Sequence, residues 1–431
     1  MVDDLAAVVA PPYDVIGADE HRRLLERDPR NVVRLDLPDD EPGDPEDERY
    51  RRAARTLNAW RVDGTLRRDP RAALYPYEQT YRVPGTEREA TRRGIFARVG
   101  LEAFGPGSGI RAHERTLAGA REDRYRLLRA TSVNTSPVVG LGADATGLVP
   151  EWLRGVASGR PAAEVVDDAD VRHRLWLAAV GEDPERDAQI AEVCKRLGAN
   201  AITLADGHHR YETALRYCEE RRAGRPVEDE PAWAEILMLI LEPVEGPLTV
   251  LPTHRVLLDL GPDDVDRFVA GLPELFEVET DVKPERLLAE LGAGAEAPSG
   301  AGRFGLWTRH GGAILQARRD AFEPWLPAGG AALRRLDVTL ASVAIDRLAG
   351  IDPAAVAAGR IAFTMDAAEA IAWVDAGARP NGSTQASVAL LLEPTPAAEI
   401  VAVAADGDVM PQKSTYIYPK ALTGLLINPL E

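Results

Sequence analysis

Five consecutive residues combine side chains used for acid–base chemistry with groups that bind anions: Asp206, Gly207, His208, His209 and Arg210. A glycine lets the backbone approach a ligand closely, and an arginine pairs with phosphate or carboxylate groups. A carboxylate can hold Mg²⁺ or accept a proton, and an imidazole can donate or accept one. The candidate catalytic residues are therefore Asp206, His208 and His209, the candidate phosphate-binding residues Gly207 and Arg210, and the candidate metal ligand Asp206.

The place of this motif between two expected elements is typical of an anion-binding turn. Residues 201–203 are apolar and β-branched in part, which predicts a strand. Apolar residues then recur at helical spacing from 211 to 222, which predicts a helix. The free N–H groups at its N-terminus would point at a ligand in the turn and favour negative charge. The alternative is that Asp206 only caps the helix and the histidines are solvated.

His113 and Glu114 form a second candidate pair, which follows a glycine-rich stretch. Adjacent residues cannot both ligate one metal from a helix face, where a spacing of four is needed. The pair suits a strand end or loop that presents one of the two side chains. Glu114 would supply the acid that the histidine-rich turn lacks for general-base catalysis. The alternative is a solvated loop without a function.

Residues 410–420 concentrate lysine, hydroxyl and aromatic side chains near the end of the chain. Lys413, Ser414 and Thr415 resemble the end of a phosphate-binding loop in residue type, but the preceding glycines of a Walker A motif are missing. A lysine ammonium and Ser/Thr hydroxyls can still bind phosphate or its metal ion. We expect Lys413, Ser414, Thr415 and Lys420 to bind phosphate or nucleotide; the alternative is a solvated tail.

Three further segments supply candidates of lower specificity. Two prolines precede Tyr13 and Asp14, and such a rigid loop either carries both side chains into a site or simply turns the chain. His254 and Arg255 repeat the His-Arg pair and could bind phosphate, or the histidine is a satisfied strand residue. Asn134 is a candidate substrate-binding residue alongside Tyr13 and Asp14.

Composition limits the classes of function. A length of 431 residues predicts more than one domain, and 45% hydrophobic residues suffice for buried cores. A net charge of −18 argues against partnership with nucleic acid or an anionic membrane surface. Cys194 and Cys218 lack metal-ligand spacing and are expected to be reduced. Neither a signal peptide nor a stretch of about 20 apolar residues is recognised, so we expect a cytoplasmic protein.

The order of elements predicts a mixed α/β (α+β) fold with mixed sheets. Alternation and periodicity predict strands at 6–10, 31–37, 74–83, 94–99, 233–241, 361–366 and 388–392. They predict helices at 50–62, 187–197, 211–222, 336–349 and 367–376. We expect an N-terminal domain of residues 1–245 and a C-terminal domain of residues 246–431, whose Lys413 segment returns to the first domain's site.

Five motifs occur together in a recognisable order: Pro11-Pro12-Tyr13-Asp14-Val15-Ile16, His113-Glu114-Arg115-Thr116, Ala205 to Ala214, Leu251-Pro252-Thr253-His254-Arg255 and Lys413-Ser414-Thr415-Tyr416. Over essentially the whole chain this series resembles the prokaryotic family labelled domain of unknown function 1015, whose name implies no activity. The Asp206 turn is more distantly similar to the nucleotide-binding turn of the ParB/sulfiredoxin superfamily, which includes free-serine kinases. That resemblance implies a turn acid at Asp206 and, more loosely, an upstream glutamate at Glu114.

Three functions are compatible with these features. The leading hypothesis is a kinase that uses ATP or ADP with Mg²⁺ to phosphorylate a small hydroxylated metabolite, with serine as first candidate by resemblance. Glu114 and His113 join the turn as its catalytic residues, because phosphoryl transfer mostly needs positioning and charge neutralisation. The alternatives are a phosphatase acting on a small phosphomonoester such as phosphoserine, and a nucleotide-switched binding protein. The oligomeric state is left open.

Overall fold

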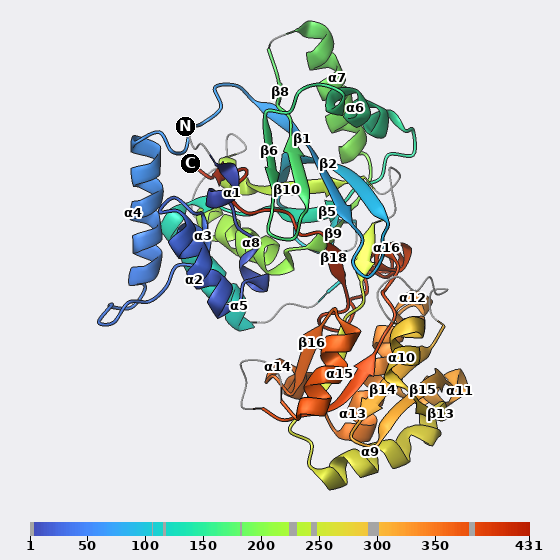
Figure 1. Cartoon of the computed structure of the whole chain (residues 1–431). Helices are drawn as coiled ribbons and strands as arrows, with labels where there is room; N and C mark the ends of the chain where they lie inside the picture. The colour runs from blue at the N-terminus through green and yellow to red at the C-terminus, as the bar shows by residue number, and fades with distance from the viewer. Residues whose placement is uncertain are drawn as a thin grey trace.

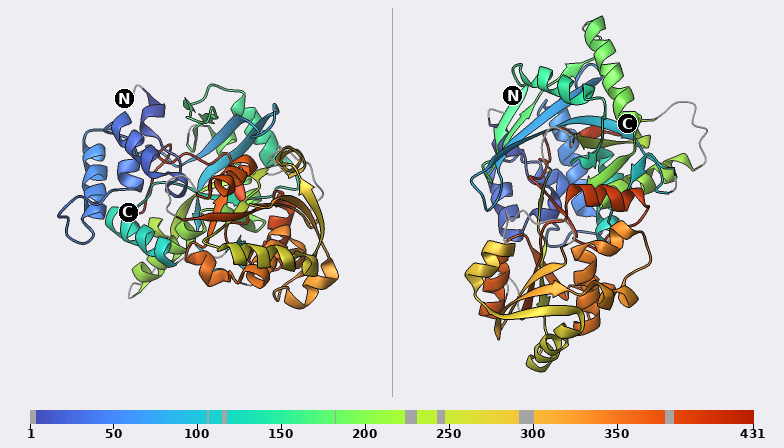
Figure 2. Two further views of the ribbon diagram at one scale, coloured as in Figure 1. Left: turned by 60° about the horizontal axis from the view of Figure 1, so that its bottom comes forward. Right: turned by 90° about the vertical axis from the view of Figure 1, so that its right-hand side faces the viewer.

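The protein folds into a mixed α and β structure in which two large sheets lie in two connected parts (Figure 1). The computed structural model describes residues 4–105, 107–114, 118–181, 183–223, 231–242, 248–291, 301–378 and 384–431. Figure 2 shows the same two parts from two further directions. The predicted mixed α/β fold class is confirmed.

The first sheet has nine strands in the order β3-β9-β5-β10-β2-β1-β7-β6, with β8 also paired to β1. Its strands are β1 (Ala73–Arg82), β2 (Glu89–Gly100), β3 (Ile110–Arg111), β5 (Val138–Leu141), β6 (Ala163–Val166), β7 (Arg172–Leu175), β8 (Ala178–Ala179), β9 (Ile202–Asp206) and β10 (Glu235–Leu241). The pairs β3·β9 and β5·β10 are parallel and the others antiparallel. The site motifs lie at the β3·β9 edge of this sheet.

Helices from the first half of the chain surround this sheet (Figure 1). They are α1 (Leu5–Val8), α2 (Ala18–Arg27), α3 (Val33–Asp36), α4 (Glu48–Val62), α5 (Ala118–Thr131), α6 (Leu148–Ala157), α7 (Pro184–Gly198) and α8 (His208–Arg222), with short 3-10 turns at Tyr13–Val15 and Ala232–Ala234. In α8 the residues Tyr211, Ala214 and Cys218 are buried, as their helical spacing predicts. This packing holds the N-terminus of α8 against the end of β9.

The second sheet has six strands in the order β13-β15-β14-β17-β12-β16, all paired antiparallel. Its strands are β12 (His254–Leu258), β13 (Phe276–Val282), β14 (Arg303–Thr308), β15 (Gly311–Ala317), β16 (Ile361–Thr364) and β17 (Ala386–Leu391). The helices of this part are α9 (Pro262–Leu275), α10 (Pro284–Leu291), α11 (Arg319–Phe322), α12 (Ala331–Arg335), α13 (Asp337–Ala349), α14 (Pro353–Ala357) and α15 (Ala367–Ala376), with a 3-10 turn at Glu323–Trp325.

The end of the chain returns to the first sheet after α16 (Ala397–Ala405). Met410 forms a bridge with Glu114, and β18 (Tyr416–Tyr418) pairs with β11 (Thr249–Leu251). Arg92 of β2 donates to the carbonyl oxygens of Tyr418, at 3.0 Å, and Pro419. The last residues pair β19 (Asn428–Pro429) with β4 (Val133–Asn134). This course brings Lys413 and Lys420 to the Asp206 turn.

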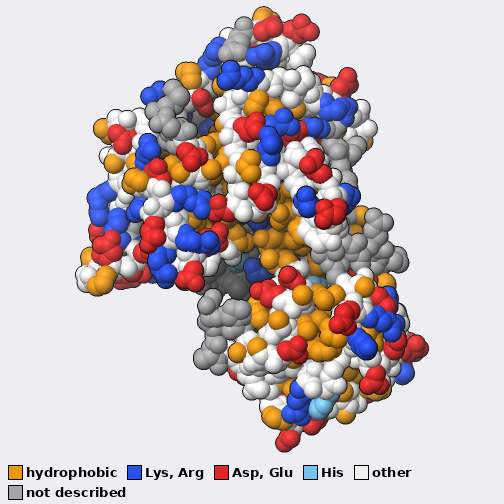
Figure 3. Space-filling model, in the orientation of Figure 1, with side chains coloured by type: hydrophobic (Ala, Val, Ile, Leu, Met, Phe, Trp, Pro, Cys, Tyr) orange, Lys and Arg blue, Asp and Glu red, His pale blue; other side chains and the backbone are white. Residues whose placement is uncertain are grey.

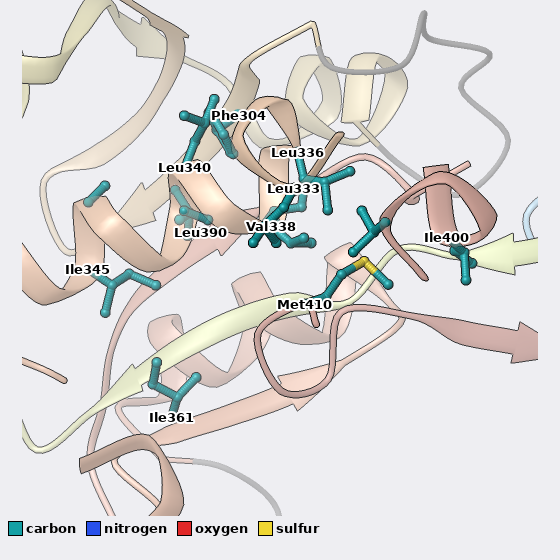
Figure 4. Packing of buried hydrophobic residues seen from close by; sticks show 14 of the residues in the cluster. Phe304, Leu333, Leu336, Val338, Leu340, Ile345, Ile361, Leu390, Ile400 and Met410 are labelled. Atoms are coloured by element: carbon teal, nitrogen blue, oxygen red, sulfur yellow. The ribbon is translucent and has the colours of Figure 1, made fainter. Parts of the chain in front are cut away.

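One hydrophobic core extends across both sheets. Leu239 and Leu241 of β10 belong to the same buried cluster as Leu390 of the second sheet and Met410 of the returning segment. Figure 4 shows Met410 in the same cluster as residues of the second part, including Val338 and Leu390. The two-domain division at residue 245 stays a prediction, and its boundary falls in residues 243–247, outside the described part of the chain.

The predicted strands at 6–10 and 31–37 are wrong, because side chains there bond the local backbone and stabilise short helices. Asp4 caps α1 by accepting a hydrogen bond from the Ala6 N–H at 3.0 Å. Asn31, which is fully buried, accepts from the Val33 N–H and donates to the carbonyl oxygens of Ala7 and Val9. The local bonds of Asp4 to Ala6 and of Asn31 to Val33 compete with strand formation, and the bonds of Asn31 to Ala7 and Val9 join the two segments.

The visible surface carries many charged side chains of both signs, in line with the 28% of charged residues in the sequence (Figure 3). In Figure 3 acidic and basic side chains are interspersed over the visible face. Among the described residues, the structure contains no helix whose length and hydropathy would let it cross a bilayer.

Candidate functional site

A sharp turn between β9 and α8 forms the base of the candidate site. Asp206 ends the strand, Gly207 adopts a left-handed φ of +85°, and His208 begins the helix. A Cβ atom at position 207 would lie 3.1 Å from Nε and Nη2 of Arg210, closer than side chains normally pack. Glycine is therefore favoured here both by the backbone conformation and by the proximity of Arg210.

Asp206 is held between two cations. Its Oδ1 accepts from Nζ of Lys420 at 2.6 Å, and its Oδ2 accepts from Nη2 of Arg210 at 2.7 Å. All three side chains are mostly buried. Burial raises the pKa of the carboxyl, but the charges of Lys420 and Arg210 outweigh it and hold the pKa of Asp206 well below its usual range. Asp206 is therefore ionised, and it orders both cations.

Arg210 fixes the turn to the neighbouring strand. Its Nη1 donates to Oγ of Ser136 at 3.1 Å and to the carbonyl oxygen of Pro137, just before β5. Burial lowers the pKa of Arg210, but the charge of Asp206 and other nearby acidic groups raises it by more, so the net shift is upward. Its guanidinium thus holds Asp206 in place and contributes positive charge to the turn.

His113 and His208 are neutral packing partners in the same region. Their rings meet edge to face with centroids 4.6 Å apart, and both side chains are buried. Nδ1 of His113 bonds the Leu204 carbonyl oxygen at 2.5 Å, and its Nε2 bonds Oγ1 of Thr415 at 3.0 Å. Burial lowers the pKa of His113 to about 4 and that of His208 well below its usual value. His113 therefore joins β9 to the returning segment.

Glu114 presents a carboxylate beside the Lys413 turn. Its Oε1 accepts from the backbone N–H of Lys413 at 2.9 Å. Burial raises the pKa of Glu114 to about 6, although the Lys413 N–H and the charges of Lys413 and Lys420 lower it in part. A carboxylate with this pKa is ionised near neutral pH and is more basic than an ordinary glutamate, which suits a general base.

The Lys413 turn offers one exposed cation and uses its hydroxyl groups internally. Lys413 is exposed, with a left-handed φ of +54°. Oγ of Ser414 donates to the Pro411 carbonyl oxygen at 2.6 Å, and the Ser414 carbonyl accepts from Thr395. Because Thr415 bonds His113, the predicted hydroxyl ligands both have structural partners. Nζ of Lys420 lies 4.4 Å from the ring centre of Tyr416.

His209 and the N-terminal loop lie at the rim. His209, in the first turn of α8, is partly buried; burial lowers its pKa and the charge of Glu212 raises it, with a net lowering. Asp14 is exposed and interacts electrostatically with His209, Arg210 and Lys420. The ring of Tyr13 lies 4.1 Å from the Arg124 guanidinium, and burial raises its pKa to about 12.

Two further predicted residues serve the framework. Oδ1 of Asn134 accepts from the Leu237 N–H at 3.1 Å and from Asn428 at 3.0 Å. Nδ1 of His254 accepts from the Leu392 N–H at 3.1 Å inside the second sheet, and burial lowers its pKa to about 4. The geometry thus favours a structural role for both.

Arg255 is a buried cation behind Glu114. Its Nη1 donates to the Thr253 carbonyl oxygen at 3.0 Å, whereas its Nη2 has no hydrogen-bond partner among the described residues. Burial lowers the pKa of Arg255 to about 10, and Glu114 is the charge that raises it. Arg255, which belongs to the second sheet, therefore adds positive potential at the Glu114 carboxylate.

The described residues fit an anion better than a protein-held metal ion. They contain no cluster of three or more His, Cys, Asp or Glu side chains that could hold a metal. Both oxygens of Asp206 already accept from cations, so Mg²⁺ at this carboxylate would compete with Lys420 and Arg210. Lys413, Lys420 and the first N–H groups of α8 suit phosphate oxygens.

Several residues of the site could not be identified from the sequence. Arg92 positions the Lys420 segment, yet it lies in a strand without any motif. Ser136 accepts a hydrogen bond from Arg210, and Asp36 interacts with Arg210 electrostatically, both from distant parts of the sequence. The only sequence signal for either residue was that Ser136 lies two positions after the candidate Asn134.

Comparisons with known proteins give one clear match and several weak structural ones. A protein from Pyrococcus furiosus described as a conserved hypothetical protein has 12% identity and a TM-score of 0.34, with 75% of this chain and 89% of that chain covered. A free serine kinase mutant in complex with ADP has 12% identity and a TM-score of 0.36, with 75% and 86% covered. SbnI from Staphylococcus aureus has 10% identity and a TM-score of 0.36, with 76% and 85% covered. Similarities this low do not establish a shared activity.

The search of curated proteins found no match. A family model described as protein of unknown function (DUF1015) matches residues 2–339, most of the chain. Lys413 and Lys420 lie beyond the matched residues, while the Asp206 turn and Glu114 lie within them. The match confirms the family predicted from the motifs: the chain belongs to DUF1015, a family of proteins of unknown function.

Proposed function

We propose that the protein is a nucleotide-dependent phosphotransferase that phosphorylates a hydroxyl group of a small metabolite, with free serine as the first acceptor to test. The observation that carries the proposal is the meeting of Glu114, Lys413 and Lys420 at the Asp206 turn. A base and two cations around a helix N-terminus supply proton acceptance and charge neutralisation, which transfer of a phosphoryl group uses.

The cations would bind and neutralise the phosphates of ATP or ADP. Lys413 is exposed, and the Lys420 ammonium has three donors, of which Asp206 takes one. The first N–H groups of α8 add positive potential at the turn. His209 stands at the same helix end as a donor to a phosphate oxygen. Mg²⁺ would enter as the partner of the nucleotide phosphates, and Asp206 would ligate it only in competition with Lys420 and Arg210.

Glu114 would act as the general base. Its carboxylate takes the proton of the acceptor hydroxyl while the hydroxyl oxygen forms a bond to the terminal phosphorus of the nucleotide. The bond from that phosphorus to the bridging oxygen breaks, and the shortened nucleotide leaves with the electron pair. Lys413 and Lys420 stabilise the charge that develops on the transferred group and the leaving oxygen.

Phosphorus NMR separates this proposal from its alternatives. One sample holds the protein with Mg²⁺, serine and ATP or ADP, and a second holds phosphoserine alone. A phosphotransferase gives a new phosphomonoester signal with loss of nucleotide, whereas a phosphatase releases phosphate from phosphoserine without nucleotide. Nucleotide binding without turnover of any acceptor would indicate the binding protein.

Two variants locate the chemistry. Glu114→Gln keeps an oxygen for the Lys413 N–H and removes the base, so turnover should fall by about 10²-fold or more. Glu185→Gln, an exposed position in the first turn of α7, should behave as wild type. Turnover that persists in Glu114→Gln would overturn the assignment of the base.

A further inference from the structure

A pocket lies directly beside the candidate site and shares Arg210 with it. Its volume is about 410 Å³, including its opening to solvent. Polar side chains of Asp36, Arg124 and Thr213 line it together with the apolar side chains of Leu128 and Ile236. Apart from Thr213, which lies in the Ala205 to Ala214 motif, none of these residues was singled out from the sequence, and the proposed transfer step does not use the pocket.

Asp36 gives the pocket an unused hydrogen-bond acceptor. The residue is 3% exposed, and its Oδ1 accepts from Oγ1 of Thr135 at 2.5 Å. Its Oδ2 has no hydrogen-bond partner among the residues that the structure describes. The carboxylate also pairs with Arg124, whose Nη1 lies 3.8 Å from Oδ1. A buried oxygen without a donor is nevertheless costly, so Oδ2 is suited to a ligand that donates from a hydroxyl or amine group.

The other polar groups of the pocket are already committed. Arg124 donates to the Asp36 carbonyl oxygen and to Oδ2 of Asp123, and Arg210 bonds Asp206, Ser136 and Pro137. The pocket therefore does not call for a second anion. Its free capacity is that of one acceptor together with the apolar side chains of Leu128 and Ile236, which matches the hydroxyl edge and carbon ring of a sugar.

The location of the pocket connects it to the proposed phosphate site. Arg210 is common to both, because its Nη2 bonds Asp206 while the side chain forms part of the pocket wall. Glu114 and Lys413 are not among the pocket's lining residues. A nucleotide whose phosphates lie at the turn would thus extend past Arg210 into the pocket.

We propose that this pocket receives the ribose of the nucleotide and that Asp36 accepts a hydrogen bond from a ribose hydroxyl. The inference rests on the proposed function and adds the subsite that distinguishes a nucleotide from a bare polyphosphate. An acidic residue that accepts from a ribose hydroxyl is a common device of nucleotide-binding folds.

Calorimetric titration with ADP and with inorganic pyrophosphate tests the pocket. Thr213→Met fills it from α8, and Thr213→Ser is the matched control that leaves it open. We expect Thr213→Met to weaken ADP binding by about tenfold or more and to leave pyrophosphate binding unchanged. Thr213→Met that binds ADP like wild type, or loses both ligands equally, overturns the inference.

The proposed hydrogen bond from a ribose hydroxyl to Asp36 is tested with 2′-deoxy-ADP and 3′-deoxy-ADP, each of which lacks one ribose hydroxyl. Asp36→Asn is the second variant. Wild-type protein should bind at least one of them about tenfold more weakly than ADP, and Asp36→Asn should reduce that preference. Equal affinities for all three nucleotides in the wild type overturn the inference. Wild-type protein that binds pyrophosphate but not ADP also overturns it while the phosphate site stands, and binding of neither ligand refutes the proposed function itself.

Discussion

At the scale of single residues, two neighbours have opposite protonation behaviour. Burial lowers the pKa of His113 to about 4 because the charged imidazolium is disfavoured, and it raises the pKa of Glu114 to about 6 because the carboxylate is disfavoured. His113 is therefore neutral and structural near neutral pH, whereas Glu114 titrates just below it. The adjacent pair thus divides into a packing residue and a candidate base.

The pH dependence of turnover should follow Glu114. Its carboxyl pKa of about 6 means that the base is protonated and inactive below that pH. We expect kcat/KM to fall by about tenfold per pH unit below pH 6 and to reach a plateau above it. Steady-state rates between pH 4.5 and 8 measure this fall, which is the acidic limb of the pH profile. A profile without an acidic limb near pH 6 would contradict the assignment of Glu114.

Arg255 should shift that limb. The guanidinium is buried and interacts with Glu114, so its removal in Arg255→Met withdraws stabilisation from the carboxylate and raises its pKa. We expect the acidic limb to move to higher pH, and Arg255→Lys to move it less. An unmoved limb in a folded Arg255→Met protein would show that Arg255 has no electrostatic role in the site.

At the scale of elements, the strand, turn and helix around Asp206 could be predicted because their signals are local. The apolar strand, the glycine and the helical periodicity each act within a few residues. The helix begins at His208, three residues before its predicted start, so both histidines belong to its first turn. The predicted N-terminal strands were wrong because local bonds of Asp4 and Asn31 stabilise short helices, and Asn31 also bonds backbone groups over 20 residues away.

Gly207 tests the turn as an element. Gly207→Ala and Gly147→Ala both place alanine at a left-handed residue before a helix, with φ of +85° and +75°. Each should lower the free energy of unfolding by about 1–2 kcal/mol. A Cβ at 147 has no atom within 4 Å, whereas one at 207 crowds Arg210. Only Gly207→Ala should therefore weaken ADP binding, and equal affinities by calorimetry would argue against the turn as a phosphate site.

At the scale of the whole molecule, the site is assembled from segments far apart in the sequence. Lys420 lies 214 residues from Asp206, and Lys413 lies 299 residues from Glu114. The residue types in the Lys413 segment indicated a function, but their place opposite Asp206 depends on Arg92 and on β18. These are pairings between distant segments, which leave no periodic signal in a single sequence.

The shared core predicts that both parts of the molecule unfold together. Met410 is fully buried in the cluster that joins the two sheets (Figure 4). Met410→Ala should lower the free energy of unfolding by about 2–5 kcal/mol and, because Met410 bridges Glu114, also weaken activity. Val401→Ala, at a more exposed position of α16, is the control. Scanning calorimetry that resolves two independent transitions would contradict a shared core.

The most direct test of the central claim is a calorimetric titration of the protein with ADP. The account predicts saturable binding that weakens by about 10-fold or more in Lys420→Met, because a charge-assisted contact to phosphate is lost. Lys420→Arg should retain part of the affinity, and the exposed Lys195→Met should match wild type. Absence of ADP binding by the wild-type protein, or equal affinity in a folded Lys420→Met protein, would contradict the account.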